Sequence, residues 1–345
     1  MLMPMSNRPA IDVLESRTLF ATLTAGVTYA TGISASKPQK NWSISLKAGQ
    51  AIYVTAGVPA GSTVTPELVL ISPNRKTLAR SIGERGALAG KVAPATGTYV
   101  VRVFDAQNSG NSSSVSVTAV FTGTTPIADG DDGGTASSGR RFAASIGPGD
   151  FDVWRIDATS GQFLSIVANE NSVNSPVGVG VVLLGPDGSG VTSKESETGF
   201  ALDVPGVKTG TYYAVVYETA VNASGRYGIS FGQTPGVQTT EDPDTQQPLV
   251  SGTPRTGDLP SGDIDLFQVS LAKGKKVSVT ATRTGSTLTP AILLIDPSGK
   301  QVAATSGTSS ATLSYTTLSA GTFSVLLRNR DGSTGGAYKL TYTVA

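Results

Sequence analysis

The chain repeats one short phrase three times, at a spacing of roughly 112 residues. The copies, each an apolar pair shortly before a proline, are Leu70-Ile71-Ser72-Pro73, Leu183-Leu184-Gly185-Pro186 and Leu294-Ile295-Asp296-Pro297. At the same distance after each proline comes a Gly-Thr-aromatic: Gly97-Thr98-Tyr99, Gly210-Thr211-Tyr212 and Gly321-Thr322-Phe323. Self-similarity at a fixed period is the signature of a repeat architecture. The 345 residues therefore predict three modules of about 100 residues, each large enough to bury its own core.

The composition and the local pattern both favour short strands. The chain has 41 Gly, 19 Pro and only 15% charged residues, which is typical of strands joined by tight turns. In each module an alternating strand, such as Trp42, Ile44 and Leu46, is followed by a Gly turn and a second alternating run, which predicts a hairpin. The apolar phrase before each proline predicts a strand buried on both faces. About seven or eight such strands per module predict an all-β protein of three tandem antiparallel, jelly-roll-like β-sandwiches.

Two polar, acidic stretches divide the chain. We expect a tail at residues 1–22, modules at residues 23–123, 141–234 and 258–345, and acidic linkers at residues 124–140 and 235–257. Each linker leads into a Gly-Asp-x-Asp-x-aromatic phrase, with Asp150 and Asp152 in module 2 and Asp263 and Asp265 in module 3.

These features together carry a family resemblance. The acidic linker, the Gly-Asp-x-Asp phrase, the Gly turn, the Leu-x-x-Pro phrase and the Gly-Thr-aromatic resemble the bacterial pre-peptidase C-terminal domain, a secreted β-sandwich attached to proteases and surface proteins. Modules 2 and 3 match along nearly their whole length. Module 1 matches in its second half and around Trp42, but it has Pro38 and Lys40 at the two acidic positions. Module 1 should therefore lack any function that depends on these two acidic residues.

The paired acids suggest a calcium site. Residues i and i+2 of a strand share a face, so Asp150 with Asp152, and Asp263 with Asp265, should lie side by side at the surface. Adjacent carboxylates repel unless a cation lies between them, and a hard cation with oxygen ligands suits that place. The linkers would complete the shell with Asp129, Asp131 and Asp132 for module 2, and with Glu241 and Asp244 for module 3. The resemblance points the same way, because some relatives bind calcium between linker and sandwich. The alternative is that these are solvated turn acids that cap strand ends.

The composition disfavours catalysis and two classes of partner. With no His and no Cys, the chain cannot form a Ser-His-Asp or Cys-His nucleophile system or an ordinary zinc or copper site. Glycosidase carboxylates face each other across a cleft from separate elements, unlike an i, i+2 pair. We therefore expect no enzymatic activity. The net charge of +1 argues against nucleic acid as a partner, and no apolar run is long enough to span a membrane.

One strand carries an unusual outer row. After Gly210, alternation places Tyr212 inward and leaves Tyr213, Val215 and Tyr217 on the other face. An apolar, aromatic outer row indicates a contact, and three candidates are a neighbouring module, another chain, or a glycan or peptide ligand.

The first residues differ from a standard secretory signal, because they lack its long apolar core. The stretch from Asp12 to Ala21 resembles the Leu-Glu-Pro-Arg segment of bacterial surface proteins, with Ser16 in place of the proline. The alternatives are a disordered tail or an extra edge strand. We expect residues 1–22 to be dispensable for folding but needed for attachment or assembly, because their apolar side chains, such as Leu19 and Phe20, favour a partner surface.

The sequence thus favours a non-enzymatic, secreted or surface-attached bacterial protein with a structural or adhesive role. Its partners would be other surface proteins or copies of itself. One alternative is a module that binds a polysaccharide or a collagen-like polymer, as some members of the family do. Another is a filament or surface-layer subunit that assembles by addition of an N-terminal strand.

Overall fold

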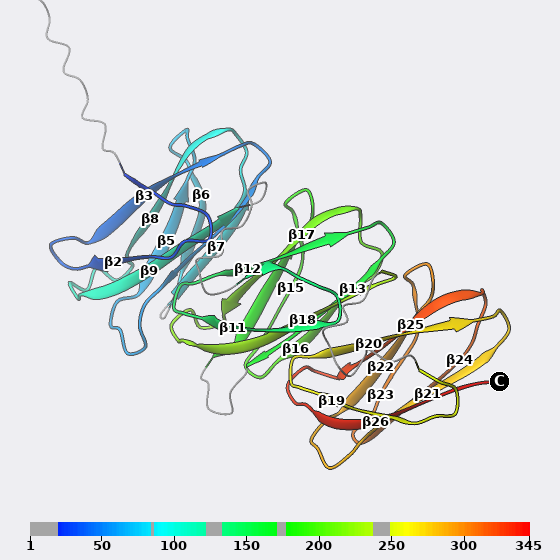
Figure 1. Ribbon diagram of the computed structural model, residues 1–345. Helices are drawn as coiled ribbons and strands as arrows, with labels where there is room; N and C mark the ends of the chain where they lie inside the picture. Colours follow the sequence, from blue (N-terminus) through cyan, green and yellow to red (C-terminus); the bar gives the residue numbers. More distant parts are fainter. Residues whose placement is uncertain (1–19, 84–85, 122–132, 171–176, 237–248) are drawn as a thin grey trace, which may run out of the picture.

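The structure is a computed structural model that describes residues 20–83, 86–121, 133–170, 177–236 and 249–345. In this part of the chain every regular element is a strand, and the strands form six sheets. The sheets pair into three β-sandwiches that follow one another along the chain (Figure 1). The predicted all-β fold of several sandwiches is confirmed. Among the described residues there is no helix with the length and apolarity of a membrane span.

Module 1 contains the first nine strands. They are β1 (Ala21–Thr22), β2 (Tyr29–Ile33), β3 (Gln39–Leu46), β4 (Ala51–Gly57), β5 (Pro66–Ile71), β6 (Thr77–Ile82), β7 (Gly86–Val92), β8 (Gly97–Asp105) and β9 (Ser113–Phe121). One sheet has the strand order β1-β3-β8-β5-β6 and the other has the order β2-β9-β4-β7.

Module 2 repeats this arrangement. Its strands are β10 (Gly134–Thr135), β11 (Arg140–Ile146), β12 (Asp152–Ala158), β13 (Phe163–Glu170), β14 (Val179–Leu184), β15 (Gly190–Ser196), β16 (Phe200–Val204), β17 (Gly210–Glu218) and β18 (Gly225–Thr234). The sheet orders are β10-β12-β17-β14-β15 and β11-β18-β13-β16.

Module 3 has the same topology over its described residues, and the counterparts of β10, residues 247–248, lie outside them. Its strands are β19 (Arg255–Leu259), β20 (Ile264–Leu271), β21 (Lys276–Arg283), β22 (Pro290–Ile295), β23 (Gln301–Ser306), β24 (Ser310–Thr316), β25 (Gly321–Asn329) and β26 (Gly336–Val344). The sheet orders are β20-β25-β22-β23 and β19-β26-β21-β24.

The eight longer strands of each module follow the order of a jelly roll. The second, seventh, fourth and fifth form one sheet, and the first, eighth, third and sixth form the other. The predicted hairpins are wrong, because β3 and β4 lie in opposite sheets, as do their counterparts in modules 2 and 3. The Gly turn joins two layers because each strand pairs with a strand far along the chain: β3 with β8, and β4 with β9.

Alternation along the strands places one set of side chains between the two sheets of each module. Trp42 of module 1 lies in the core at 2% exposure, and Trp154 has the same place in module 2 at 4%. The Trp154 Nε1 donates a hydrogen bond to the Tyr227 hydroxyl at 3.0 Å, so the buried indole donor is satisfied. Phe267 takes this position in module 3. Three separate cores result, one in each predicted module.

The described strands extend beyond the module bounds expected from the sequence. β1 pairs in parallel with β3, with Ala21 opposite Trp42, and β10 pairs with β12 in the same register, with Gly134 opposite Trp154. Residues 21–22, expected in the tail, and residues 134–135, expected in a linker, therefore belong to sheets. β19 likewise begins at Arg255, inside the range expected to be the second linker. A two-residue strand has no alternation to detect, which is why the pattern missed two of these elements.

Deletion of residues 1–19 should leave the denaturant midpoint of the protein unchanged, whereas Leu23→Ala should lower it. Leu23 is 2% exposed in the core of module 1, and loss of a buried Leu side chain costs about 2–5 kcal/mol. Chemical denaturation followed by circular dichroism measures both effects. A deletion that unfolds module 1 would show that residues 1–19 belong to its core.

Candidate functional site at the module junctions

The first junction packs an outer sheet face of module 1 against an outer sheet face of module 2. Module 1 contributes Val120 of β9, with the partly buried Tyr53 and Leu88. Module 2 contributes side chains of β12, β14 and β17 and of the residue before β12: Phe151, Val153, Val182, Leu184, Tyr213, Val215 and Tyr217. These side chains form one apolar cluster that crosses the boundary between two sandwiches. Burial of such side chains stabilises the contact by about 1.5–3 kcal/mol each.

The outer row predicted from the sequence lies in this junction. Val215 is 1% exposed and Tyr217 is 8% exposed, and Tyr213 is partly buried against the same cluster. The Tyr217 ring meets Phe151 edge to face, with centroids 6.5 Å apart. Its hydroxyl donates to Glu195 Oε2 at 3.1 Å. Burial, with the nearby Glu195 carboxylate, raises the pKa of Tyr217, so this hydroxyl stays protonated and remains a donor.

Close backbone approach completes the first junction. Thr118 of β9 donates from Oγ1 to the Gly149 carbonyl oxygen at 2.6 Å, and Thr28 Oγ1 donates to Asp150 Oδ1 at 2.8 Å. A Cβ on Gly57 would overlap the Gly149 nitrogen, and a Cβ on Gly149, which has φ +70°, would overlap module 1 in turn. Glycine is required at both positions because two backbones meet there. The first acid of the Gly-Asp-x-Asp phrase is thus a contact to the preceding module.

The second junction uses the next pair of outer faces. Module 2 contributes Phe163 and Val167 of β13, with Ala201 of β16 beside them. Module 3 contributes residues of β20, β22 and β25: Ile264, Leu266, Leu293, Ile295 and Leu326. Every residue of this cluster except Ala201 is at most 3% exposed. The two junctions therefore repeat one geometry, in which the sheet containing β12 or β20 covers the module before it.

An ion pair between a nearly buried arginine and a partly exposed aspartate distinguishes the described part of the second junction from that of the first. Arg328 of β25 donates to both carboxylate oxygens of Asp203 on β16, at 2.8 and 2.7 Å. It also donates to Ser165 Oγ at 3.0 Å, and Ser165 donates to Asp203 Oδ1 at 2.8 Å. A bidentate guanidinium–carboxylate pair fixes orientation as well as contact, because its two hydrogen bonds are coplanar. Arg328 takes the place that Tyr217 has in module 2.

Asp263 has a position equivalent to that of Asp150. Its Oδ1 accepts hydrogen bonds from Ser230 Oγ at 3.0 Å and from the Ile264 N–H at 2.8 Å. Arg141 of module 2 donates to the Ser261 carbonyl oxygen at 3.0 Å. Burial lowers the pKa of the Arg141 guanidinium, while the charge of Asp263 opposes that shift. Asp150 and Asp263 both precede their strands and both bind the previous module.

The predicted surface position of the acid pairs is wrong for their second members. Asp152 is 1% exposed and Asp265 is 0% exposed. Each lies two residues before a core aromatic, Trp154 or Phe267, and so on the inner side of its strand. Alternation predicts which side chains of a strand share a face. It does not predict whether other parts of the chain cover the end of that face and bury the side chains there.

The described residues do not by themselves form the predicted metal site. No group of three or more acidic side chains with metal-ligand geometry occurs among them. Five of the predicted ligands lie outside the described residues: Asp129, Asp131, Asp132, Glu241 and Asp244. One oxygen each of Asp150 and Asp263 already accepts two hydrogen bonds. A shell of six to eight oxygens therefore depends on the linkers.

A buried polar residue ends the strand after each Gly-Thr-aromatic, and sequence analysis missed it. Asp105, Glu218 and Asn329 stand at this position, at 8%, 1% and 1% exposure. Glu218 accepts hydrogen bonds from the backbone N–H groups of Ala220 at 2.9 Å and Asn222 at 2.7 Å. The signal is present in the sequence, because each of the three residues follows its Gly at the same distance.

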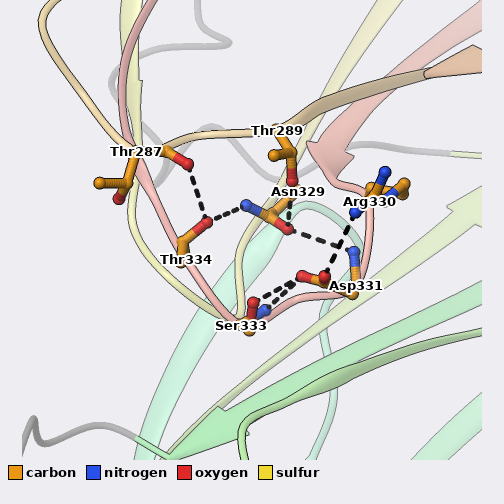
Figure 2. A network of polar contacts seen from close by, with 7 residues as sticks. All are labelled: Thr287, Thr289, Asn329, Arg330, Asp331, Ser333 and Thr334. Atoms are coloured by element: carbon orange, nitrogen blue, oxygen red, sulfur yellow. Dashed lines mark hydrogen bonds and ion pairs between the residues drawn. The ribbon is translucent and has the colours of Figure 1, made fainter. Parts of the chain in front are cut away.

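Figure 2 shows the corresponding network around Asn329. The Asn329 Oδ1 accepts hydrogen bonds from the Asp331 N–H and the Thr289 hydroxyl, and its amide donates to Thr334. Asp331 accepts from the backbone N–H and the hydroxyl of Ser333. Burial acts to raise the pKa of the Asp331 carboxyl, but the Ser333 hydrogen bonds, together with the Arg330 charge and a backbone hydrogen bond, outweigh it and the pKa is lowered. The turn after β25 is therefore held by side chains on both sides.

These braced turns rest on the preceding module. A Cβ on Gly57 of module 1 would overlap the Val221 carbonyl oxygen, so the turn after β17 lies against module 1. A Cβ on Gly332 would overlap the Phe200 carbonyl oxygen, so the turn after β25 lies against module 2. Glu218 and Asn329 thus support the junctions as well as their own modules.

The sheet at the far side of module 3 has a different outer surface. Aligned on the Gly turn, Lys276, Ser278 and Thr280 of β21 stand where Phe163, Ser165 and Val167 stand on β13. Hydroxyls continue across this sheet, with Thr280 paired to Thr312 at 3.0 Å. The surface that would receive a fourth module lacks the two apolar side chains that module 2 uses to receive the third.

Neither a family model nor a curated protein matches this chain. Among solved structures, the pre-peptidase C-terminal domain of a collagenase from Bacillus anthracis is similar at 19% identity and a TM-score of 0.25, over 29% of this chain and 95% of that one. PliG, a periplasmic inhibitor of g-type lysozyme from Aeromonas hydrophila, is similar at 18% identity and a TM-score of 0.24, over 30% of this chain and 98% of that one. A structure from Sulfolobus Turreted Icosahedral Virus is similar at 9% identity and a TM-score of 0.19, over 92% of this chain and 89% of that one.

Arg328→Ala should destabilise the second junction, whereas Arg330→Ala should not. The Arg328 side chain is 9% exposed, and its removal leaves Asp203 and Ser165 without their shared donor, at a cost of about 1–3 kcal/mol after allowance for the 28% exposure of Asp203. Arg330 forms an exposed 3.9 Å contact with Asp331, worth less than about 0.5 kcal/mol. Denaturation midpoints of the two variants, compared with wild type, measure the difference. Equal losses would show that the Arg328 pair does not support the junction.

Proposed function

We propose that the chain is a non-enzymatic extracellular structural or adhesive protein, in which three modules act as one stiff rod on a bacterial surface. The single observation that carries the proposal is the pair of sheet-on-sheet junctions, each with an apolar centre and polar contacts at its edge. Modules joined only by linkers pivot freely, whereas large apolar contacts hold their orientation. The sequence phrases of a secreted β-sandwich family support the extracellular setting.

A rod holds whatever is attached to one end at a fixed distance from the other. That is a task for a spacer or an adhesin stalk, and it needs no nucleophile, metal chemistry or cleft. The composition supports this role, because a chain without His or Cys lacks the side chains on which most hydrolases depend. Its partners would be other surface proteins or further copies of this chain.

Leu326→Asp should convert the rod into a jointed chain. Leu326 is 0% exposed at the centre of the second junction, and a carboxylate there removes an apolar contact and adds the cost of taking a charge out of water when the faces pack. Thr312→Asp is the matched control, because it places the same group on an exposed outer position of β24. Small-angle scattering of wild type should fit one rigid shape, and L326D should broaden the distance distribution while T312D does not. If wild type itself fits only a flexible ensemble, the rod proposal is wrong.

We also propose that calcium stiffens the linkers, with Asp150 and Asp263 as the ligands nearest to the modules. Millimolar calcium should then raise the melting temperature, because an ion bound only by the folded state stabilises by mass action, by about 2.7 kcal/mol at a hundredfold excess over Kd. Asn substitutions at Asp150 and Asp263 should abolish the increase, and Lys40→Asn in module 1 should leave it intact. Identical melting curves in chelator and in calcium would remove calcium from the proposal.

A further inference from the structure

Module 1 carries a polar groove that neither junction uses. The groove has a volume of about 730 Å³ and lies between the start of β3, the edge strand β2 and the start of β9. Its polar lining includes Lys37, Lys40, Ser34 and the run Ser112, Ser113 and Ser114, and it contains no carboxylate and no aromatic ring. The loop that joins β2 to β3 lies on the side of module 1 turned away from module 2 (Figure 1).

The charges of the groove are uncompensated within the described chain. Lys37 and Lys40 are both exposed, and neither forms an ion pair with a described residue. Two ammonium groups with several hydroxyl donors and no carboxylate make a surface that attracts anions. Each exposed contact is weak by itself, so useful affinity requires a ligand with many charges.

Module 1 as a whole has the same bias. Residues 23–123 contain nine Lys and Arg against three Asp and Glu, a net charge of +6. Residues 124–234 contain six Lys and Arg against twelve Asp and Glu, a net charge of −6. The overall charge of +1 therefore hides two modules of opposite sign. An anionic partner is attracted to one end of the rod and repelled from its middle.

The groove also includes a position at which module 1 differs from modules 2 and 3. Lys40 stands at the position of Asp152 and Asp265, which are nearly fully buried, whereas Lys40 is exposed. In modules 2 and 3 the residues before the strand contact the previous module, through Asp150 and Asp263. At module 1 no earlier module covers this position among the described residues. The position that carries a buried acid in modules 2 and 3 therefore carries an exposed base in module 1, and Pro38 stands where the other two modules have the junction acid.

We propose that this groove binds the carboxylate or sulfate groups of an acidic polysaccharide. An open groove with exposed charges suits an extended, repeating anion better than a single small ion. The absence of aromatic rings argues against single-stranded nucleic acid, whose bases need stacking partners. The site would hold one end of the rod to a glycan-coated surface. It goes beyond the proposed rod and does not depend on it.

The test measures binding of the full chain to dextran sulfate, alginate and neutral dextran at low ionic strength. The double variant Lys37→Gln, Lys40→Gln removes two charges from the groove. The control variant Lys47→Gln, Lys91→Gln removes two charges from exposed positions of module 1 that do not line it. We expect the groove variant to lose at least fivefold in affinity for an anionic polymer and the control to lose less than twofold. We also expect wild-type affinity to fall as salt is added.

Binding to dextran sulfate, to alginate or to both supports the proposal, and the ratio of the two affinities shows which of sulfate and carboxylate the groove prefers. Equal losses in the two variants would attribute binding to the diffuse charge of module 1 and overturn the groove. Absence of binding to both anionic polymers, or equal binding to neutral dextran, would overturn the proposal as well. A DNA oligonucleotide that binds as tightly as dextran sulfate, with the same dependence on Lys37 and Lys40, would replace the polysaccharide by nucleic acid. Scattering of each variant reports on the rod separately, so the two proposals can fail independently.

Discussion

Burial of one sheet face against another is the interaction on which every other feature of this molecule depends. It builds the core of each jelly roll, and it recurs where module 1 meets module 2 and where module 2 meets module 3. Strands of the central module are therefore apolar on both faces, as in β14, where Val181 faces the core and Leu184 faces module 1. The loss of one such layer exposes apolar surface on two modules at once, so the stability of each module is coupled to its neighbour.

The alternation of apolar residues predicts on which face of its strand a side chain lies. It does not predict which strand or module covers that face. Alternation assigned Tyr213, Val215 and Tyr217 to an outer face, and the structure buries Val215 and Tyr217 against module 1. The same pattern suggested hairpins across the Gly turns, because a turn between two strands looks alike whether the strands pair or lie in opposite sheets. The burial of Asp152 and Asp265 was equally hidden, since it depends on elements distant in sequence. The sequence therefore predicts sandwiches well and junction chemistry poorly.

The two junctions share a geometry but differ in chemistry. The first has an aromatic pair, Tyr217 against Phe151, and the second has mostly aliphatic side chains around Phe163 and the Arg328–Asp203 pair at the strand position of Tyr217. A module that carries Arg328 finds a matching carboxylate on β16 of module 2, whereas β7 of module 1 has Gly90 at the equivalent register position. An arginine moved to the first junction would be buried without its partner. Each face therefore discriminates between its proper neighbour and the other one.

The hydroxyl-covered outer sheet of module 3 has a consequence for how such a chain can change. With Lys276 and Thr280 in place of the apolar residues on β13, a duplicated copy of module 3 appended after residue 345 would find no surface on which to stack. Stacking of another module on this sheet would require apolar side chains at these two positions, as Phe163 and Val167 provide on β13. A reordered chain with module 3 before another module would meet the same obstacle, because the outer sheet of module 3 lacks these apolar side chains. The outer sheet of module 3 therefore differs in kind from the outer sheets that modules 1 and 2 present to their neighbours.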